Sequence, residues 1–210
     1  MDRRLLISSA AALVGAQAIA PLARAQDEPP GDARPMPPPG EGPNDANHPV
    51  PTYARDELIN QVSDFFGVTA ESAGAIIERI FRENGQPTGY IAGTEASGAF
   101  AVGLRYGHGL LYMKERPRQQ VFWQGPSIGF DVGGNASRSF TLCYNLQFPD
   151  MIYRRFPGVD GSAYFIGGLG VNYQRAEDIT LAPIRAGVGL RLGASVGYLA
   201  YSRTRHILPF

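Results

Sequence analysis

A regular alternation of residue types near the C-terminus is the feature that most constrains the fold. From Gly187 to Tyr198, apolar side chains occupy every second position, and glycine, serine or arginine fills the positions between them. Because successive side chains of a strand point to opposite faces, this pattern predicts a strand with one apolar face and one small or polar face. Similar alternation begins upstream at Gly89. The C-terminal two-thirds of the chain is therefore predicted to be a β domain.

Short alternating runs separated by glycine-containing turns predict about seven to ten antiparallel strands. One run spans residues 100–106, with a turn at Tyr106–Gly109, and later runs span Tyr164–Gln174 and Ile184 to about Ser202. Glycine weakens an ordinary strand, so its repetition indicates strong bending or a close approach of another group. We expect a mainly β fold, a small Gly-rich antiparallel β-barrel whose bulky strand faces fill the interior.

Two amphipathic α-helices are predicted before the barrel, packed on its outside or across one end. The first covers Arg55–Phe66, where apolar residues recur at helical spacing, and Gly67 ends it. The second follows Thr69 as N-cap and stops at Asn84–Gly85. Its apolar stripe consists of Ala73, Ile76, Ile77, Ile80 and Phe81.

The N-terminus has the features of an export signal. Two arginines precede an apolar stretch, and an Ala-x-Ala site at Ala23–Ala25 predicts cleavage between Ala25 and Gln26. The general secretion route is favoured, and the paired arginines leave the twin-arginine route open. The predicted organisation is a cleavable signal peptide (1–25), a disordered Pro-rich tether (26–51) and a single domain of helical hairpin plus barrel (52–210). No transmembrane helix is expected in the mature chain.

The charge balance and the cysteine count narrow the class of protein. The chain has 19 basic and 19 acidic side chains, which argues against a nucleic-acid partner. Cys143 is the only cysteine, so no intrachain disulfide forms, and we interpret it as structural.

No motif for catalysis, cofactor binding or metal binding is apparent. The glycines at 187 and 189 lack the third glycine of a dinucleotide fingerprint, since Leu192 stands in its place. The three histidines, His48, His108 and His206, are scattered, and no metal-ligand spacing occurs. We therefore predict no catalytic, cofactor-binding or metal-binding residues, no cofactor, and a protein that is not an enzyme.

One polar cluster stands out. Arg154 and Arg155 lie between Tyr153 and Phe156, and paired arginines beside aromatic rings suit a phosphate, a lipid headgroup or an anionic glycan. The simpler interpretation is that both arginines lie in a solvated loop. We name Arg154 and Arg155 as candidate contacts for an anionic ligand.

An outer-membrane β-barrel is an alternative class, because a lipid-facing apolar face alternates in the same way. The terminal Phe210 resembles the assembly signal of such barrels, whereas Pro209 would interrupt a terminal strand. The two amphipathic helices argue for a barrel surrounded by water. In that case large side chains such as Leu142 turn inward.

Several long segments together resemble the envelope integrity protein A (EipA) family of bacterial periplasmic proteins, over about residues 52–205. The segments are Gly89–Gly93, Gly98–Lys114, Trp123–Asp131 and Gly187–Tyr201. The resemblance implies a soluble periplasmic small β-barrel that supports envelope integrity, a family with no enzymatic activity assigned and no site residues to transfer. A weaker likeness, in the Gly-rich strands and Tyr201–Arg203, is to SYLF-type lipid-binding domains.

The resulting hypothesis is a non-catalytic periplasmic protein that supports the cell envelope by binding an envelope lipid, glycan or protein. The alternatives are a lipid- or amphiphile-binding module and an outer-membrane β-barrel.

Overall fold

The computed structural model describes residues 49–100, 102–128, 137–186 and 197–206. The predicted signal peptide and nearly all of the predicted tether lie outside these residues. So do Phe210 and residues 187–196 of the alternating run. Val50, at the end of the predicted tether, is partly buried against the apolar core.

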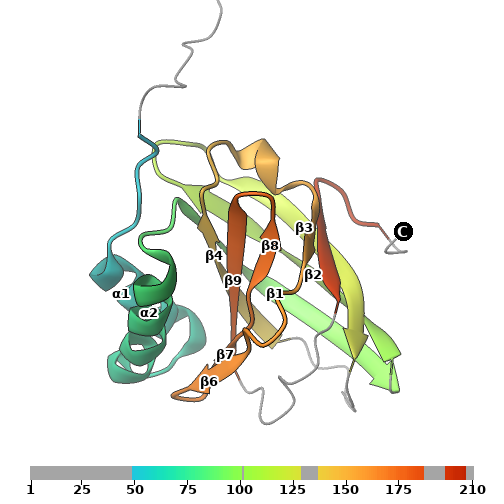
Figure 1. Ribbon diagram of the computed structural model, residues 1–210, viewed down its shortest axis with the longest axis horizontal. Coiled ribbons are helices and arrows are strands. Elements are labelled where there is room, and N and C mark those ends of the chain that lie inside the picture. Colours follow the sequence, from blue (N-terminus) through green and yellow to red (C-terminus); the bar gives the residue numbers. More distant parts are fainter. Residues whose placement is uncertain (1–48, 101, 129–136, 187–196, 207–210) are drawn as a thin grey trace, which may run out of the picture. The chain divides into compact units, whose positions relative to one another are not determined.

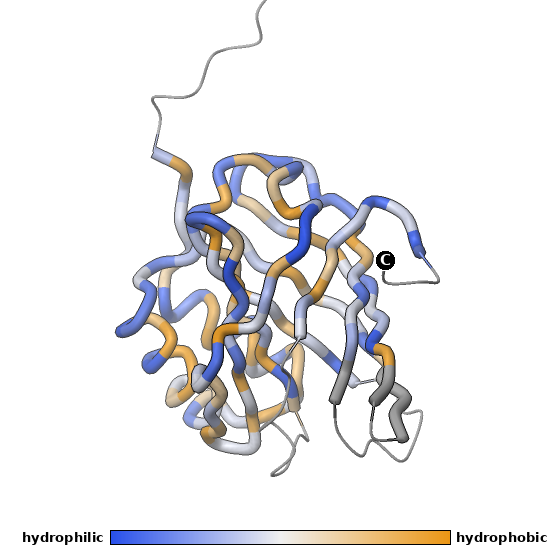
Figure 2. The backbone as a smooth tube through the Cα atoms, turned by 45° about the vertical axis from the view of Figure 1, so that its right-hand side comes forward, coloured by the Kyte–Doolittle hydropathy of each residue, from blue (hydrophilic) through white to orange (hydrophobic). Residues whose placement is uncertain are grey.

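Both predicted helices form, and their ends follow from local capping. Helix α1 spans Arg55–Phe66, and Gly67 after it adopts a left-handed conformation with φ of 68°. Helix α2 spans Ala70–Asn84, and the Thr69 hydroxyl accepts a hydrogen bond from the Ser72 amide at 3.2 Å. Figure 2 shows hydrophobic and hydrophilic residues alternating along both helices, as expected when one face is buried.

Within the described residues, ten strands join in one antiparallel sheet, in the order β5-β10-β3-β2-β1-β4-β9-β7-β6, with β8 also paired to β9 (Figure 1). A short 3₁₀ helix, Pro149–Ile152, precedes β5. The strands are β1 Gly89–Phe100, β2 Val102–Met113, β3 Gln119–Ile128, β4 Ser137–Tyr144, β5 Arg155–Pro157, β6 Tyr164–Ile166, β7 Leu169–Val171, β8 Gln174–Ala176, β9 Ile179–Ala186 and β10 Tyr198–Ser202.

The sheet curls on itself. A β-bridge between Gly158, just after β5, and Gln174, in β8, links the β5 edge of the sheet to the strand beside β9. The predicted class, a mainly β, barrel-like antiparallel sheet preceded by two helices, is confirmed.

Each face of the curled sheet has its own apolar cluster. The outer cluster joins Tyr90, Phe140 and Ile184 to the buried stripes of α1 and α2. The inner cluster includes Ile91, Trp123 and Leu181. Because side chains alternate along a strand, β4, β9 and the first residues of β1 are buried on both faces.

The prediction that the bulky faces fill the interior is wrong for β4. Phe140 and Leu142 belong to the outer cluster, beneath the helices, whereas Cys143 belongs to the inner one. The reason is that the helices cover this part of the outer face, so the larger side chains fill the space between sheet and helices. Leu142 is fully buried there and does not belong to an outward apolar belt.

The predicted turn at Tyr106–Gly109 is also wrong, because these residues lie inside β2 and pair with both β1 and β3. The chain reverses instead between β1 and β2, where Phe100 pairs with Val102. The glycines serve close packing. A Cβ at Gly109 would lie 2.5 Å from the Ala92 carbonyl oxygen, and one at Gly107 would lie 2.1 Å from the Trp123 ring.

Two later runs are divided differently from the prediction. Tyr164–Gln174 is broken by a turn at Gly167 and Gly168, whose φ angles of 60° and 82° suit glycine. The run predicted to begin at Ile184 is the end of a strand that begins earlier, because β9 spans Ile179–Ala186 and continues through Pro183. Pro183 lies between the residues that pair with β8 and those that pair with β7. A residue without an N–H group is tolerated at such a change of partner.

We expect Gly107→Ala to lower the free energy of unfolding by about 1–3 kcal/mol, because the added methyl group would force the Trp123 ring aside. Urea unfolding followed by the fluorescence of Trp123 measures this. The matched control is Gly74→Ala in α2. Its Cβ would meet only Ile59 at 3.8 Å, so removing a helical glycine should stabilise by roughly 0.5–1 kcal/mol. Equal stability of Gly107→Ala and the wild type would contradict the packing argument.

Candidate functional site

A buried ion pair lies on the inner face of the sheet. Glu95 of β1 and Arg185 of β9 are each 3% exposed. Their side chains meet although β4 lies between the two strands in the sheet. The Arg185 Nε donates to Glu95 Oε1, and Arg185 Nη2 donates to Glu95 Oε2 at 3.3 Å. This forked contact of a planar guanidinium with a carboxylate is the strongest geometry available to such a pair.

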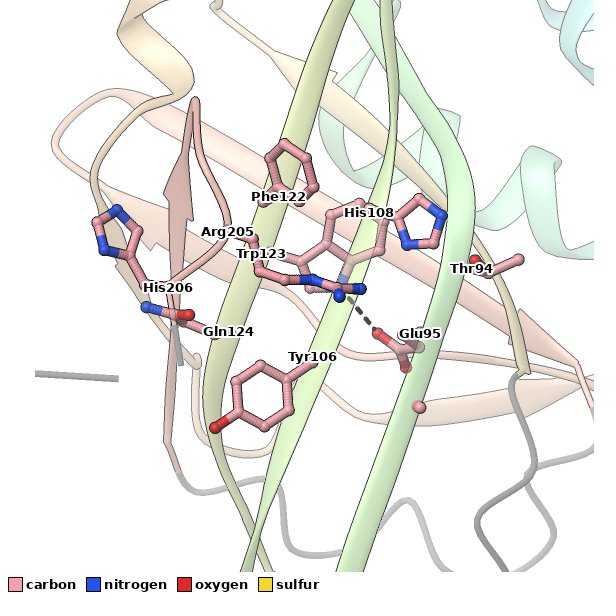
Figure 3. A pocket seen from close by; sticks show the side chains of 11 residues that line it. Thr94, Glu95, Tyr106, His108, Phe122, Trp123, Gln124, Arg205 and His206 are labelled. Atoms are coloured by element: carbon pink, nitrogen blue, oxygen red, sulfur yellow. Dashed lines mark hydrogen bonds between the residues drawn. The ribbon is translucent and has the colours of Figure 1, made fainter. Parts of the chain in front are cut away.

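Further groups complete the cluster around Glu95. Trp123 Nε1 donates to Glu95 Oε2 at 3.2 Å (Figure 3), and Arg105 Nε lies 3.6 Å from Glu95 Oε1. Arg185 Nη1 also donates to Asn172 Oδ1 at 2.7 Å. We call Glu95, Arg105, Trp123, Asn172 and Arg185 the inner polar cluster. It joins side chains of β1, β2, β3 and β9 with one from the segment after β7.

Gly107 in β2 makes this arrangement possible. Glu95 pairs with Gly107, and Gly107 pairs with Trp123, so the three residues form one row across β1, β2 and β3. Since Gly107 has no side chain, the indole ring lies across its position and reaches the carboxylate.

The electrostatics fix the ionisation state of Glu95. Burial alone would raise the pKa of its carboxyl, but the Arg185 and Arg105 guanidiniums outweigh this and hold the pKa below its ordinary value of 4.5. Glu95 is therefore a permanent anion near neutral pH, which makes it a poor proton donor or acceptor for catalysis.

A small pocket of about 150 Å³ opens above this cluster (Figure 3). Strands β1, β2 and β3 form one side of it, and Arg205 and His206, from the segment after β10, also line it. Its volume is below the ~300–1,000 Å³ that ligand sites usually have. It is lined by Thr94, Glu95, Ala96, Tyr106, Gly107, His108, Phe122, Trp123, Gln124, Arg205 and His206.

A larger hollow of about 650 Å³ lies on the outer face of the sheet, beneath α1. We call it the α1 groove. Its volume is within the usual range for small-molecule sites. Its lining residues are Glu57, Asn60, Gln61, Asp64 and Phe65 of α1, Tyr90 and Ala92 of β1, Tyr112 of β2 and Phe140 of β4.

Aromatic rings form the floor of the α1 groove. Tyr112, Tyr90 and Phe140 stack in a row across three strands, with 4.8 Å between successive ring centroids and interplanar angles of 12° and 11°. Phe65 closes one end by an edge contact with Phe140 at 5.5 Å. Tyr90 and Phe140 are buried, whereas Tyr112 is partly exposed, so Tyr112 presents the accessible part of this floor.

The two arginines named from the sequence have separate partners. Arg154 Nη1 lies 2.6 Å from Glu177 Oε2, and the exposed Arg155 guanidinium lies 5.1 Å from the centre of the Tyr198 ring. The pair lies in β5 and the bend before it, away from both hollows. An anionic ligand at Arg154 and Arg155 remains a prediction.

Cys143 is the free cysteine of the described residues, and it is buried. Cys143 is fully buried on the inner face, and burial raises the pKa of its thiol. Within the described residues, no three His, Cys, Asp or Glu side chains are grouped to hold a metal ion. No helix among those residues is long and apolar enough to cross a membrane.

No local motif of the sequence marks Glu95, Arg105 and Arg185 as a site, and none marks the α1 groove. A signal for the cluster was present, because Glu95 and Arg185 are charged residues at the same parity as Ile91 and Leu181 of their strands. A charge at an inward position of a buried strand requires a partner. Which strand supplies that partner depends on the sheet order, which the sequence does not state.

The fold and these two hollows define the protein as a helix-covered, barrel-like β protein with a filled interior and an open aromatic groove outside. The chain matches the sequence model of the Envelope integrity protein A family over residues 51–210, and it belongs to that family. It is also similar to the crystal structure of a β-barrel-like, uncharacterized protein from Brucella abortus. That similarity has 46% identity and a TM-score of 0.69, and covers 76% of this chain and 99% of the other. No curated protein matches the sequence.

We expect Glu95→Gln to lower the free energy of unfolding by about 3–5 kcal/mol, because it leaves the buried Arg185 guanidinium and the partly buried Arg105 guanidinium without their counter-charge. Urea unfolding measures the loss. The matched control is Glu177→Gln, which breaks the ion pair of an exposed carboxylate and should cost less than about 1 kcal/mol. Similar losses for both variants would show that burial does not determine how much an ion pair contributes to the free energy of unfolding.

The Glu95 pKa also predicts how stability depends on pH. Because the folded pKa is below the ordinary 4.5, the carboxylate stabilises the fold fully above that pH. The contribution is lost as the pH falls through 4.5 towards the folded pKa. Measured from about pH 7 to 3, the stability difference between wild type and Glu95→Gln should shrink below pH 4.5. A constant difference over this range would refute the assignment.

Proposed function

We propose that this protein is a non-catalytic periplasmic factor that supports the integrity of the cell envelope by binding one of its components. The observation that carries the proposal is the family match over residues 51–210, since the family's name states a role in envelope integrity. The sequence features of an export signal support a periplasmic location.

The two hollows favour binding over catalysis. Glu95, the buried carboxylate, is held as an anion by two guanidiniums and has a lowered pKa, whereas a general acid or base needs a pKa near the working pH. The α1 groove offers a broad surface with stacked rings and amide side chains, which suits recognition of a ligand.

Two other functions receive less support. An outer-membrane barrel needs an apolar outer surface, but α1 and α2 cover the outer face of the sheet around Phe140, Leu142 and Ile184. A lipid- or amphiphile-binding module needs an apolar cavity for a chain. The inner face is instead filled by Trp123, Phe156, Tyr201 and the inner polar cluster.

Gene deletion with complementation tests the proposal. We expect deletion to increase sensitivity to detergent and the full-length chain to restore resistance. Variants His108→Ala and His206→Ala should restore it as well, because no catalytic role is assigned to these residues.

A chain without residues 1–25 should fail to restore resistance, and the same chain behind an unrelated secretion signal should succeed. Restoration by the unexported chain would rule out a periplasmic site of action, and failure of the histidine variants despite normal folding would argue for catalysis.

A further inference from the structure

An aromatic floor and a polar wall meet in the α1 groove. Its floor ends in the partly exposed Tyr112 ring, which stacks on Tyr90 at 4.8 Å. Tyr90 covers one face of this ring, and the accessible part of Tyr112 lines the groove as an apolar aromatic surface. Sugars bind to such surfaces through the C–H groups on one face of the pyranose ring, because the aromatic face carries partial negative charge.

The wall of the groove supplies hydrogen-bonding groups. Glu57, Asn60, Gln61 and Asp64 recur at positions that share one face of α1, and all four line the groove. Their carboxylate and amide oxygens accept hydrogen bonds, and the amide groups also donate. Sugar hydroxyl groups need such acceptors on one side and an apolar platform on the other.

Charge decides which class of ligand fits. Two carboxylates line the groove, and no basic side chain does. Lys114 lies at the rim, where its Nζ is 3.1 Å from Glu57 Oε2. A phosphate or carboxylate ligand would meet like charge from Asp64 and would compete with Glu57 for Lys114. The groove therefore disfavours anionic ligands, in contrast to the arginine pair at 154 and 155.

We propose that the α1 groove binds an uncharged oligosaccharide, with Tyr112 as the stacking platform and Asn60 and Asp64 as polar contacts. This inference rests on the proposed function, because it names the chemical class of the envelope component that the protein binds. The groove volume of about 650 Å³ suits a short saccharide chain better than a single small ion.

Calorimetric titration with two matched probes tests the inference. The uncharged probe is chitotetraose, a tetramer of N-acetylated amino sugars, and its de-acetylated counterpart carries positive amines on the same backbone. Inorganic phosphate and anionic phospholipid vesicles are the remaining probes. We expect chitotetraose to bind, and the phosphate and vesicles not to bind. The de-acetylated tetramer should bind more weakly. Asp64 would attract its amines, but Glu57 is already paired with Lys114, and the tetramer lacks the acetamide groups that the amides of α1 would pair with.

Variants locate the site. Tyr112→Ala should weaken chitotetraose binding about tenfold by removing the platform. Asn60→Ala, an exposed position on α1 that leaves the fold undisturbed, should weaken it about threefold to tenfold. The controls are Tyr198→Ala, a partly exposed tyrosine outside the groove, and Glu78→Ala on the exposed face of α2. Both controls should leave binding unchanged, and circular dichroism checks that each variant is folded.

Several results would overturn the inference. These are no binding of chitotetraose, binding that neither Tyr112→Ala nor Asn60→Ala weakens, tighter binding of the de-acetylated tetramer, or binding of phosphate or vesicles in its place. The complementation experiment reports separately on the proposed function. If the exported chain alone restores resistance while chitotetraose fails to bind, the saccharide is wrong and the envelope role stands.

Discussion

The carboxylate of Glu95 is the constraint around which the sheet is arranged. A charge on the inner face of a buried strand is tolerated only with its counter-charges in place, and these come from β2 and β9 on either side. The row Glu95–Gly107–Trp123 further requires β1, β2 and β3 to pair in one register. A slip of one residue would turn Glu95 to the outer face and break every contact at once. The cluster thus favours one register over its neighbours, in addition to whatever it contributes to stability.

Among the described residues, the outer face of the sheet is covered by packed helices and has no buried ion pair at its centre. Helix α1 buries Leu58 and Val62, and α2 buries its own apolar stripe, so the helices cover the part of the sheet around Phe140 and Ile184. The stacked rings continue past this cover to Tyr112. Where the polar side of α1 overhangs these rings, the α1 groove forms. The groove is therefore a consequence of how a half-buried helix lies on a sheet wider than itself.

Local signals in the sequence predicted local structure well. Gly67, Thr69 and Gly85 act on the backbone beside them, and the end of α1 and both ends of α2 lie where these residues predict. Signals that depend on distant partners are less reliable. Glycine is common in turns, so Gly107 and Gly109 predict a turn, but in the structure they admit Trp123 and the backbone of β1. The α1 groove could not be foreseen, since Glu57 and Tyr112 are adjacent only after folding.

The division between the two faces bears on where a ligand can bind. The inner face is occupied by Trp123, Phe156 and Tyr201 together with the inner polar cluster, and the hollow left above them has about 150 Å³. Enlarging that hollow would expose Glu95 and its arginines to water and weaken the contacts that fix the sheet register. The outer face differs, because the polar groups of the α1 groove are on α1 and are not needed for strand pairing. Ligand recognition at the α1 groove can therefore change by substitution on one helix face without disturbing the register of the barrel.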